Sequence, residues 1–292
     1  MNRWATRSAA SGAMPAVFVF LWSTGFIGVK FGLPYAPPAT FLTLRFALVV
    51  MLMLPIALVQ RAPWPRSPAQ VAHLAVVGAL VHGGYLGGVF TALHLGLSAG
   101  LVALIVGMQP VLTALAAASF LGEHVSKRQW TGLALGVIGV ALAVAQKFSL
   151  AGFSIAGFAM SVLGLVSITA GTLYQKRHGG AFDLRTGSVI QFVAAALVTA
   201  PFALVLEDLH VTWAPQFLLA LAWLVIVLSI GAISLLALLI RRGEATRIAS
   251  LFYLVPPTTA AMAYVFFGET FSGPAAIGFV LAMTGVALVI RK

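Results

Sequence analysis

The chain has 292 residues, of which 61% are hydrophobic and only 8% are charged, and its formal net charge is +11. Charged residues make up about 25% of a soluble domain, so this composition excludes a soluble globular protein. The net positive charge is compatible with a nucleic-acid-binding protein, but the Lys and Arg residues lie singly or in pairs between apolar runs, which favours a role in membrane topology instead.

Apolar runs of about 20 residues, the length of a helix that crosses a bilayer, follow one another along the chain. The first run, 14–33, follows Arg3 and Arg7 as a signal peptide would, but it is too long for one, so we interpret it as the first span. The predicted fold class is all-α integral membrane. In chain order the pattern predicts ten transmembrane helices, at 14–33, 39–59, 69–90, 97–119, 128–146, 153–175, 184–206, 215–239, 245–266 and 273–290.

The loop charges predict how these helices are oriented. Of the 17 Lys and Arg residues, 14 lie in the termini or in loops on the side of the termini. Lys147 lies in a loop on the opposite side, and Lys30 and Arg45 fall within spans. Because Lys and Arg resist translocation, both termini are expected in the cytoplasm.

The two halves of the chain resemble each other at an offset of 146 residues. Residues 93–142 align with 239–288 without a gap, and 17 of these 50 positions are identical, Pro110 and Pro256 among them. Each half holds five predicted helices, an odd number, so the second half must enter the membrane from the opposite side. The sequence therefore predicts two inverted five-helix repeats, at 14–146 and 153–290.

Inverted repeats favour a transport function. Two similar halves can exchange conformations and expose a central site to each side of the membrane in turn. Some channels are also built from inverted repeats, so a pore for small solutes is the alternative. A carrier saturates and shows counterflow, whereas flux through a channel does not saturate.

Two groups of residues carry a family resemblance. The first helix contains Trp22, Ser23, Thr24, Gly25 and Phe26 and closes on Lys30. A second element, Pro110, Gly122-Glu123, Trp130, Gly132 and Gly139, recurs as Pro256, Gly268-Glu269, Gly278 and Gly285. These motifs resemble the EamA type of the drug/metabolite transporter superfamily, and within it the YddG-type aromatic amino acid exporters. The resemblance implies ten helices with inward termini, and export of amino acids or other small metabolites across a bacterial inner membrane.

Ionisable groups within spans are candidates for function because they are costly in lipid. Lys30 and Arg45 lie toward the periplasmic ends of their spans, where snorkelling to the interface explains either one. A positively charged vestibule also fits Lys30. Arg45 lies deeper and suits pairing with backbone carbonyls or with a substrate carboxylate.

All six acidic residues lie in loops or at span ends. Proton-driven carriers usually hold a buried acid, so the sequence predicts a facilitator without proton coupling. His82, well inside the third span, is the group that could substitute for an acid, although a neutral, hydrogen-bonded histidine is the alternative. Glu123 and Glu269 match across the halves just after their spans, where stabilisation of helix ends and loops is expected.

Pro110 and Pro256 fall in the middle of equivalent spans. A proline frees a backbone carbonyl and bends a helix, and such breaks persist in a bilayer where they line a cavity or where a neighbouring helix satisfies them. We expect the two prolines to face one another near the midplane. With the neighbouring Gln109, they are candidate substrate-binding residues.

Aromatic side chains within spans complete the candidate site. Trp22 lies in the family-like stretch, and Tyr85 lies between two glycine pairs whose small size leaves room for a ligand. Packing or anchoring at the lipid interface is the alternative for such aromatic residues. The predicted substrate-binding residues are Trp22, His82, Tyr85, Gln109, Pro110, Tyr253 and Pro256.

Motifs of intramembrane enzymes are absent from the sequence, including clustered acids, the H-E-x-x-H zinc pair and the Gly-x-Ser-x-Gly nucleophile. The chain also has no cysteine, so disulfides and thiolate metal sites are excluded. We therefore predict no catalytic residue, no cofactor and no metal. The expected partners are a small-molecule substrate and the lipid bilayer, without nucleic acid. Gly132 and Gly136 have the spacing of a dimerising helix or of internal packing, and the oligomeric state is left open.

Overall fold

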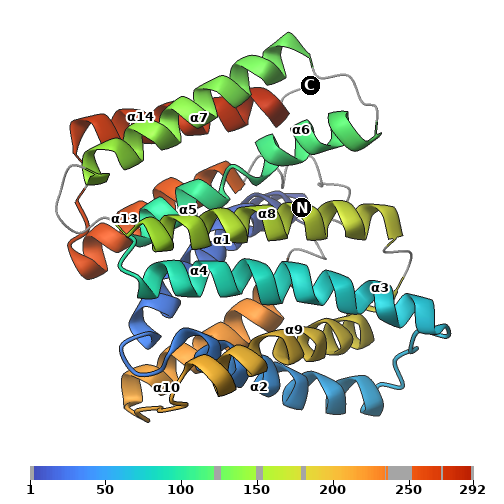
Figure 1. The fold of residues 1–292 in the computed structure, drawn as a ribbon. Coiled ribbons are helices and arrows are strands. Elements are labelled where there is room, and N and C mark those ends of the chain that lie inside the picture. Colours follow the sequence, from blue (N-terminus) through green and yellow to red (C-terminus); the bar gives the residue numbers. More distant parts are fainter. Residues whose placement is uncertain are drawn as a thin grey trace.

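A computed structural model describes residues 3–121, 126–148, 154–178, 182–233, 235, 252–270 and 272–290, which form helices and loops without a strand (Figure 1). The predicted all-α fold is thus confirmed for these residues. Helix falls within each of the ten predicted spans, although some spans are built from several helical segments.

The helices follow the predicted spans in chain order. Those of the first half are α1 (Arg3–Gly32), α2 (Pro38–Val59), α3 (Pro68–Gly78), the π-helix η1 (Ala79–Gly84), α4 (Tyr85–His94), α5 (Ala99–Val106), α6 (Gln109–Leu121) and α7 (Lys127–Phe148). Those of the second half are α8 (Ile155–His178), α9 (Leu184–Leu206), α10 (Pro215–Ala222), the π-helix η2 (Trp223–Ala232), the 3-10 helix η3 (Phe252–Leu254), α13 (Val255–Phe267) and α14 (Gly273–Ile290).

Pro110 and Pro256 lie in the first turns of α6 and α13 rather than within continuous helices. The first N–H groups of a helix have no partner in that helix, so a proline there loses no hydrogen bond. The turn at Gly107 and Met108 separates α5 from α6, and η3 precedes α13. The bends expected at the two prolines are therefore starts of new helical segments.

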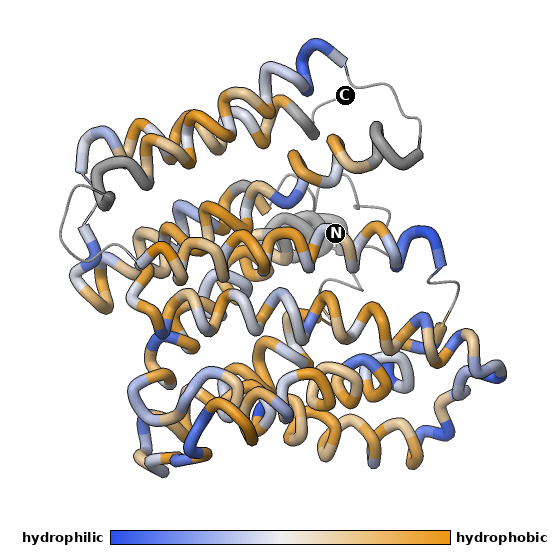
Figure 2. The backbone as a smooth tube through the Cα atoms, viewed as in Figure 1, coloured by the Kyte–Doolittle hydropathy of each residue, from blue (hydrophilic) through white to orange (hydrophobic). Residues whose placement is uncertain are grey.

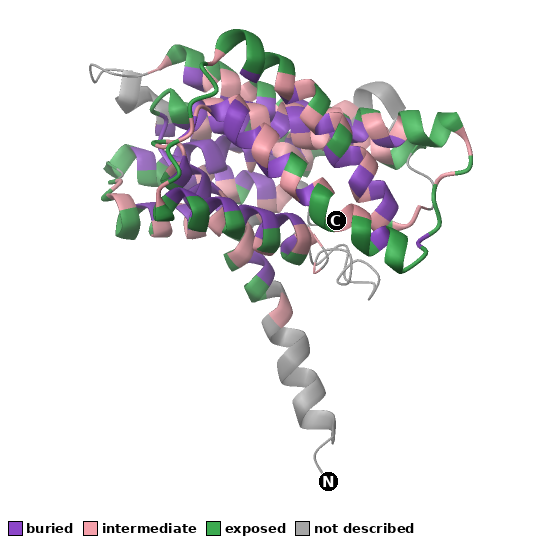
Figure 3. Ribbon diagram, turned by 90° about the horizontal axis from the view of Figure 1, so that it is seen from below, coloured by how far each residue is buried: buried purple, intermediate pink, exposed green. Residues whose placement is uncertain are grey.

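The outer surface of the bundle is apolar. Hydrophobic residues cover the middle of the helices and hydrophilic residues their ends (Figure 2). Buried residues lie inside the bundle and exposed residues around it (Figure 3), and large apolar side chains such as Val205 (79%) and Leu219 (72%) are exposed. Such a surface is stable in lipid and not in water.

The chain is a multi-pass membrane protein. Among the described residues, five segments are long and apolar enough to cross a bilayer: Pro38–Val59, Pro68–His94, Ile155–His178, Leu184–Leu206 and Pro215–Ala232.

Helices that are equivalent under the 146-residue offset pack against each other. α2 lies along α9, and α7 lies along α14 at one edge of the molecule (Figure 1). Gly139 faces Gly278 while Gly132 faces Gly285, so α7 and α14 are antiparallel. A side chain at these positions would overlap the facing backbone, which is why small residues occupy such contacts. In this structure Gly132 and Gly136 therefore serve internal packing.

Side chains at the helix ends satisfy free backbone N–H groups. Glu207, just after α9, accepts hydrogen bonds from the N–H groups of Ala39 (2.8 Å) and Thr40 (2.7 Å) and so caps the start of α2. At the start of α7, Ser126 Oγ accepts from Gln129 N (3.3 Å), and Gln129 Oε1 accepts from Ser126 N (2.8 Å), the reciprocal pattern of a capping box.

Glu269 has the stabilising role expected of it. Its carboxylate forms an ion pair with Lys30 at the end of α1 and accepts a hydrogen bond from the N–H of Ala99 at the start of α5 (3.1 Å). This carboxylate therefore joins the loop after α13 to two helices of the other half. Its counterpart Glu123 lies outside the described residues.

Candidate functional site

A cavity lies inside the bundle where segments of both halves meet. Its walls come from α1, α2, η1, α4, α8, α9 and η2, and the centres of water-sized molecules fit in about 100 Å³ of it. One buried water needs about 10–15 Å³ on that measure, so the cavity has room for several waters or for a small metabolite. The lining is mostly apolar, and its polar or ionisable side chains are Trp22, Arg45, His82, Tyr85 and Ser229.

The two π-helices meet at this cavity. η1 contributes Val81 and His82, and η2 contributes Leu228 and Ser229. Adding 146 to the bounds of η1 (79 and 84) gives 225–230, which lies within η2. π-Helical turns are rare and occur frequently at functional sites. Both halves thus carry the same uncommon deformation at equivalent positions beside the cavity.

Arg45 of α2 places a positive charge in the cavity wall. The residue is only 6% exposed, and its Nε and Nη2 donate to Ser229 Oγ at 3.2 and 3.1 Å. Ser229 in turn donates to the backbone carbonyl of Leu224 within η2 (3.0 Å). Of the carboxylates in the described residues, none lies within ion-pair distance of Arg45. The charge on this guanidinium is therefore not neutralised by the part of the protein that the structure describes.

His82 of η1 is held against α9. Its Nε2 lies 3.3 Å from Oε1 of Gln191, and its ring stacks on Phe192 with the ring centroids 4.4 Å apart. The same ring lines the cavity. His82 is thus hydrogen-bonded and packed, which agrees with the hydrogen-bonded histidine that the sequence analysis gave as the alternative to a proton carrier. Its ring also reaches the cavity.

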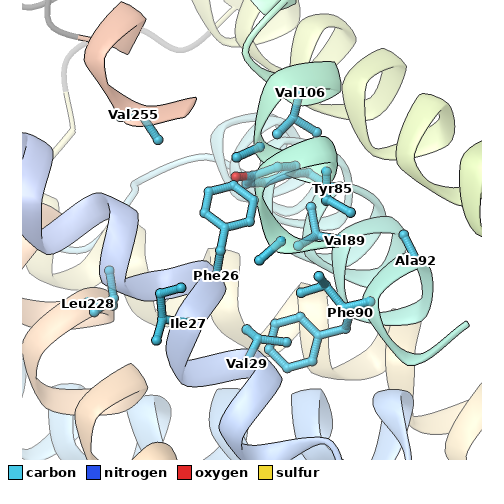
Figure 4. Packing of buried hydrophobic residues seen from close by; sticks show 14 of the residues in the cluster. Phe26, Ile27, Val29, Tyr85, Val89, Phe90, Ala92, Val106, Leu228 and Val255 are labelled. Carbon is cyan, nitrogen blue, oxygen red and sulfur yellow. The ribbon is translucent and has the colours of Figure 1, made fainter. Parts of the chain in front are cut away.

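Trp22 and Tyr85 flank the cavity from α1 and α4. Trp22 packs against Phe18 (ring centroids 5.4 Å apart) and edge-on against Phe252 (5.3 Å). Tyr85 is buried, and Figure 4 shows Phe26 of α1 directed toward it. The structure therefore brings three predicted site residues, Trp22, His82 and Tyr85, to one cavity.

The other predicted site residues lie elsewhere. The Gln109 amide donates to Thr172 Oγ1 (3.0 Å) and so links α6 to α8, and neither Gln109 nor Pro110 lines the larger cavity. Pro256 lines a second, much smaller cavity beside the break between α5 and α6. The side chain of Tyr253 lies outside the part of the chain that the structure describes. Substrate binding by these four residues stays a prediction.

The sequence pattern did not single out Ser229 and Phe192, which line the cavity, or Gln191, which bonds to His82. Serine and glutamine occur in many apolar helices, and no motif surrounds these two. The 146-residue offset held a usable signal, because it makes Ser229 equivalent to Gly83, the residue that follows His82.

The groups at the cavity suit reversible binding of a small molecule. A guanidinium, an imidazole, an indole, a phenol and a hydroxyl are set among apolar walls, and ligand sites usually combine a few polar groups with an apolar lining. The described residues contain no group of three or more His, Cys, Asp or Glu side chains that could hold a metal ion.

Comparison with known proteins extends these observations. The EamA-like transporter family matches the chain over residues 12–145 and 155–291. Two proteins named probable amino-acid metabolite efflux pump, from Salmonella typhimurium and Escherichia coli, are 28% and 27% identical over 288 and 289 residues, which is 96% of this chain and 94% of each relative. A probable terminal-alkyne amino-acid exporter of Streptantibioticus cattleyicolor is 27% identical over 206 residues, 66% of this chain and 65% of that protein. A solved crystal structure shares the fold, with a TM-score of 0.63 at 19% identity, and the match covers 95% of this chain and 96% of that chain.

Proposed function

Because the chain belongs to the EamA-like transporter family, we propose that it exports amino acids or related small metabolites across the inner membrane of a bacterium. The two bacterial relatives that align over 94% of their length are named probable amino-acid metabolite efflux pumps, which supports this substrate class. The observation that carries the proposal is the cavity, which is lined by helices of both halves inside an apolar bundle. Carriers with repeated halves bind substrate in such a place, near the bilayer midplane.

In the proposed complex the substrate lies among Trp22, His82 and Tyr85. The face of an indole attracts an ammonium group, and the imidazole and the phenol offer hydrogen bonds. Gln109, Pro110 and Pro256 are not among the residues that line this cavity, and the side chain of Tyr253 lies outside the described residues, so the proposed complex does not include these four.

The proposed mechanism is alternating access by two inverted repeats, at 14–146 and 153–290. Three features support it: the 146-residue offset, the antiparallel contact of the equivalent helices α7 and α14, and the equivalent π-helices at the cavity. When two inverted repeats exchange their conformations, the central site closes to one side of the membrane and opens to the other. The excess of Lys and Arg in the loops beside the termini supports cytoplasmic termini.

Transport by purified protein in liposomes tests the proposal. The vesicles are loaded with a panel of unlabelled amino acids and nucleobases, one at a time, and uptake of the labelled form of each solute is followed. We expect saturable uptake and counterflow for one or more amino acids. Flux that rises linearly with concentration, without counterflow, would favour the pore instead. Protein-free liposomes serve as the control.

A further inference from the structure

Arg45 has hydrogen-bonding capacity that the described protein does not use. A guanidinium carries five N–H donors in a rigid planar fork, and the donors from Nε and Nη2 that find a partner share a single oxygen, Ser229 Oγ. Arg45 also lines the cavity. Within the described residues its remaining donors have no hydrogen-bond partner, so they are available to a molecule in the cavity.

The charge of Arg45 also calls for a counter-ion. An unpaired ion is strongly disfavoured in a protein interior and within a bilayer. The lining of the cavity contains no acidic residue among the described ones. The acids of the described chain lie at helix ends and in loops, where Glu207, Glu269 and Asp183 already accept backbone N–H groups. The described part of the protein supplies the positive charge of the site but no negative charge to match it.

The rest of the cavity lining indicates what the uncharged part of a ligand would be. Val29, Val89, Ile168 and Leu228 form apolar walls, and Phe192 and Trp22 add aromatic surface. One fixed cation among such walls suits a molecule with one carboxylate and an apolar body, because arginine binds carboxylates through two parallel charge-assisted hydrogen bonds.

We propose that Arg45 binds the carboxylate of the transported substrate and so restricts the site to small carboxylates with an apolar body, apolar amino acids above all. This assignment rests on the proposed transport function for its physiological meaning. Ser229, on η2, orients the guanidinium. The competing role for Arg45 is structural, in which it only ties α2 to η2 through Ser229.

Binding to the purified, detergent-solubilised protein separates the two roles. The probes are L-phenylalanine, 3-phenylpropionate and 2-phenylethylamine, which carry both charged groups, the carboxylate alone and the ammonium alone. The corresponding set built on leucine covers a smaller body. Dissociation constants from titration calorimetry are compared for the wild type, Arg45→Gln, Arg45→Lys and, as a matched control in an exposed loop, Arg66→Gln.

We expect the wild type to bind the amino acid and the carboxylate but the amine far more weakly. Arg45→Gln should weaken binding of both carboxylates about 10- to 100-fold, the range for losing a hydrogen bond to a charged group. Arg45→Lys should fall between, because it keeps the charge but not the planar fork. Arg66→Gln should behave as the wild type.

Three results would overturn the assignment: no carboxylate of either set binds the wild type, Arg45→Gln binds them as tightly as the wild type, or Arg45→Gln lowers the melting temperature of the ligand-free protein and weakens carboxylates and amines alike. If Arg45→Gln cannot be purified, Arg45→Lys gives the measurement, and carboxylate affinity unchanged in it counts against the proposal. Carboxylate binding through Arg45 without any transport in liposomes would sink the proposed function and leave this assignment standing.

Discussion

Trp22 has two kinds of neighbour, and they predict different effects of removing its indole. On one side it packs against Phe18 and Phe252, and on the other it lines the cavity. The residue is only partly buried, so its truncation leaves a smaller unfilled volume than truncation in a closed core. Loss of function should therefore exceed loss of stability.

We expect Trp22→Ala to insert and purify normally and to raise the KM for a confirmed substrate about 2- to 10-fold, the range of a single aromatic contact. Trp130→Ala is the matched control, because Trp130 is 54% exposed on α7 and does not line the cavity. Initial rates of uptake into liposomes at varied substrate concentration give the comparison. A Trp22→Ala protein with unchanged rate and affinity would place the substrate contacts elsewhere.

Residues that differ sharply from an apolar surrounding were predictable from the sequence. Trp22, Arg45, His82 and Tyr85 all stand out in this way, and all four reach the cavity. Gln109 stands out equally, yet its amide bonds to another helix at Thr172. A polar side chain in a span can serve a ligand or a neighbouring helix, and the choice depends on contacts between distant parts of the chain, which local sequence does not encode.

At the level of elements, the glycines around Tyr85 are positioned by helix packing. A Cβ on Gly84 would lie 2.7 Å from Ser167 Oγ, and one on Gly88 would overlap the backbone of Met160 in α8. By contrast, Gly87 has no neighbour within 4 Å of an added Cβ. The room for a ligand that the sequence suggested at these glycines is thus taken up at Gly84 and Gly88 by α8, and the open space at Gly87 is not part of the cavity lining.

Gly88→Ala and Gly87→Ala form a matched pair one residue apart. We expect Gly88→Ala to destabilise the protein by about 1–3 kcal/mol, because α4 and α8 must separate to admit the methyl group. Gly87→Ala should be neutral or stabilising by up to about 1 kcal/mol, since alanine favours helix over glycine. Thermal unfolding in detergent, followed by intrinsic fluorescence, measures both. Equal melting temperatures for the two variants would contradict the close approach of α4 and α8.

Helix positions were predictable because an apolar run of the right length becomes a span in lipid whatever its neighbours are. The predicted limits of α9 and α14 agree with the structure. The π-helices η1 and η2 were not predictable, since a π-helical turn differs from an α-helical one by one residue and leaves the apolar pattern unchanged. The span predicted at 97–119 is broken into α5 and α6. This break was not predictable, because a proline in the sequence does not show whether the helix bends there or a new helix starts.

For the whole molecule, the loop charges predict cytoplasmic termini. In the predicted ten-span topology, 14 of the 17 Lys and Arg residues lie on the side of the termini, and such residues resist translocation. Alkaline phosphatase, active only in the periplasm, and green fluorescent protein, fluorescent only in the cytoplasm, are each fused after Lys292. We expect fluorescence and no phosphatase activity. The reverse result would overturn the predicted cytoplasmic position of the C-terminus.

At the scale of the whole molecule, the residues that the structure describes offer no clear device for coupling transport to protons. Carriers driven by a proton gradient usually titrate a buried acid, whereas Glu207 and Glu269 are engaged at helix ends, and among the described residues His82 is the histidine that lines the cavity. A solute that flows down its own gradient then needs no second driving force.

We expect uptake into substrate-free liposomes to keep its initial rate within about twofold when a protonophore removes any pH difference. Counterflow into liposomes loaded with unlabelled substrate should be equally insensitive. If the protonophore abolishes uptake with no substrate gradient opposing it, the facilitator mechanism is wrong. His82→Gln, which keeps a hydrogen-bonding group opposite Gln191 but cannot titrate, then shows whether the imidazole carries the proton.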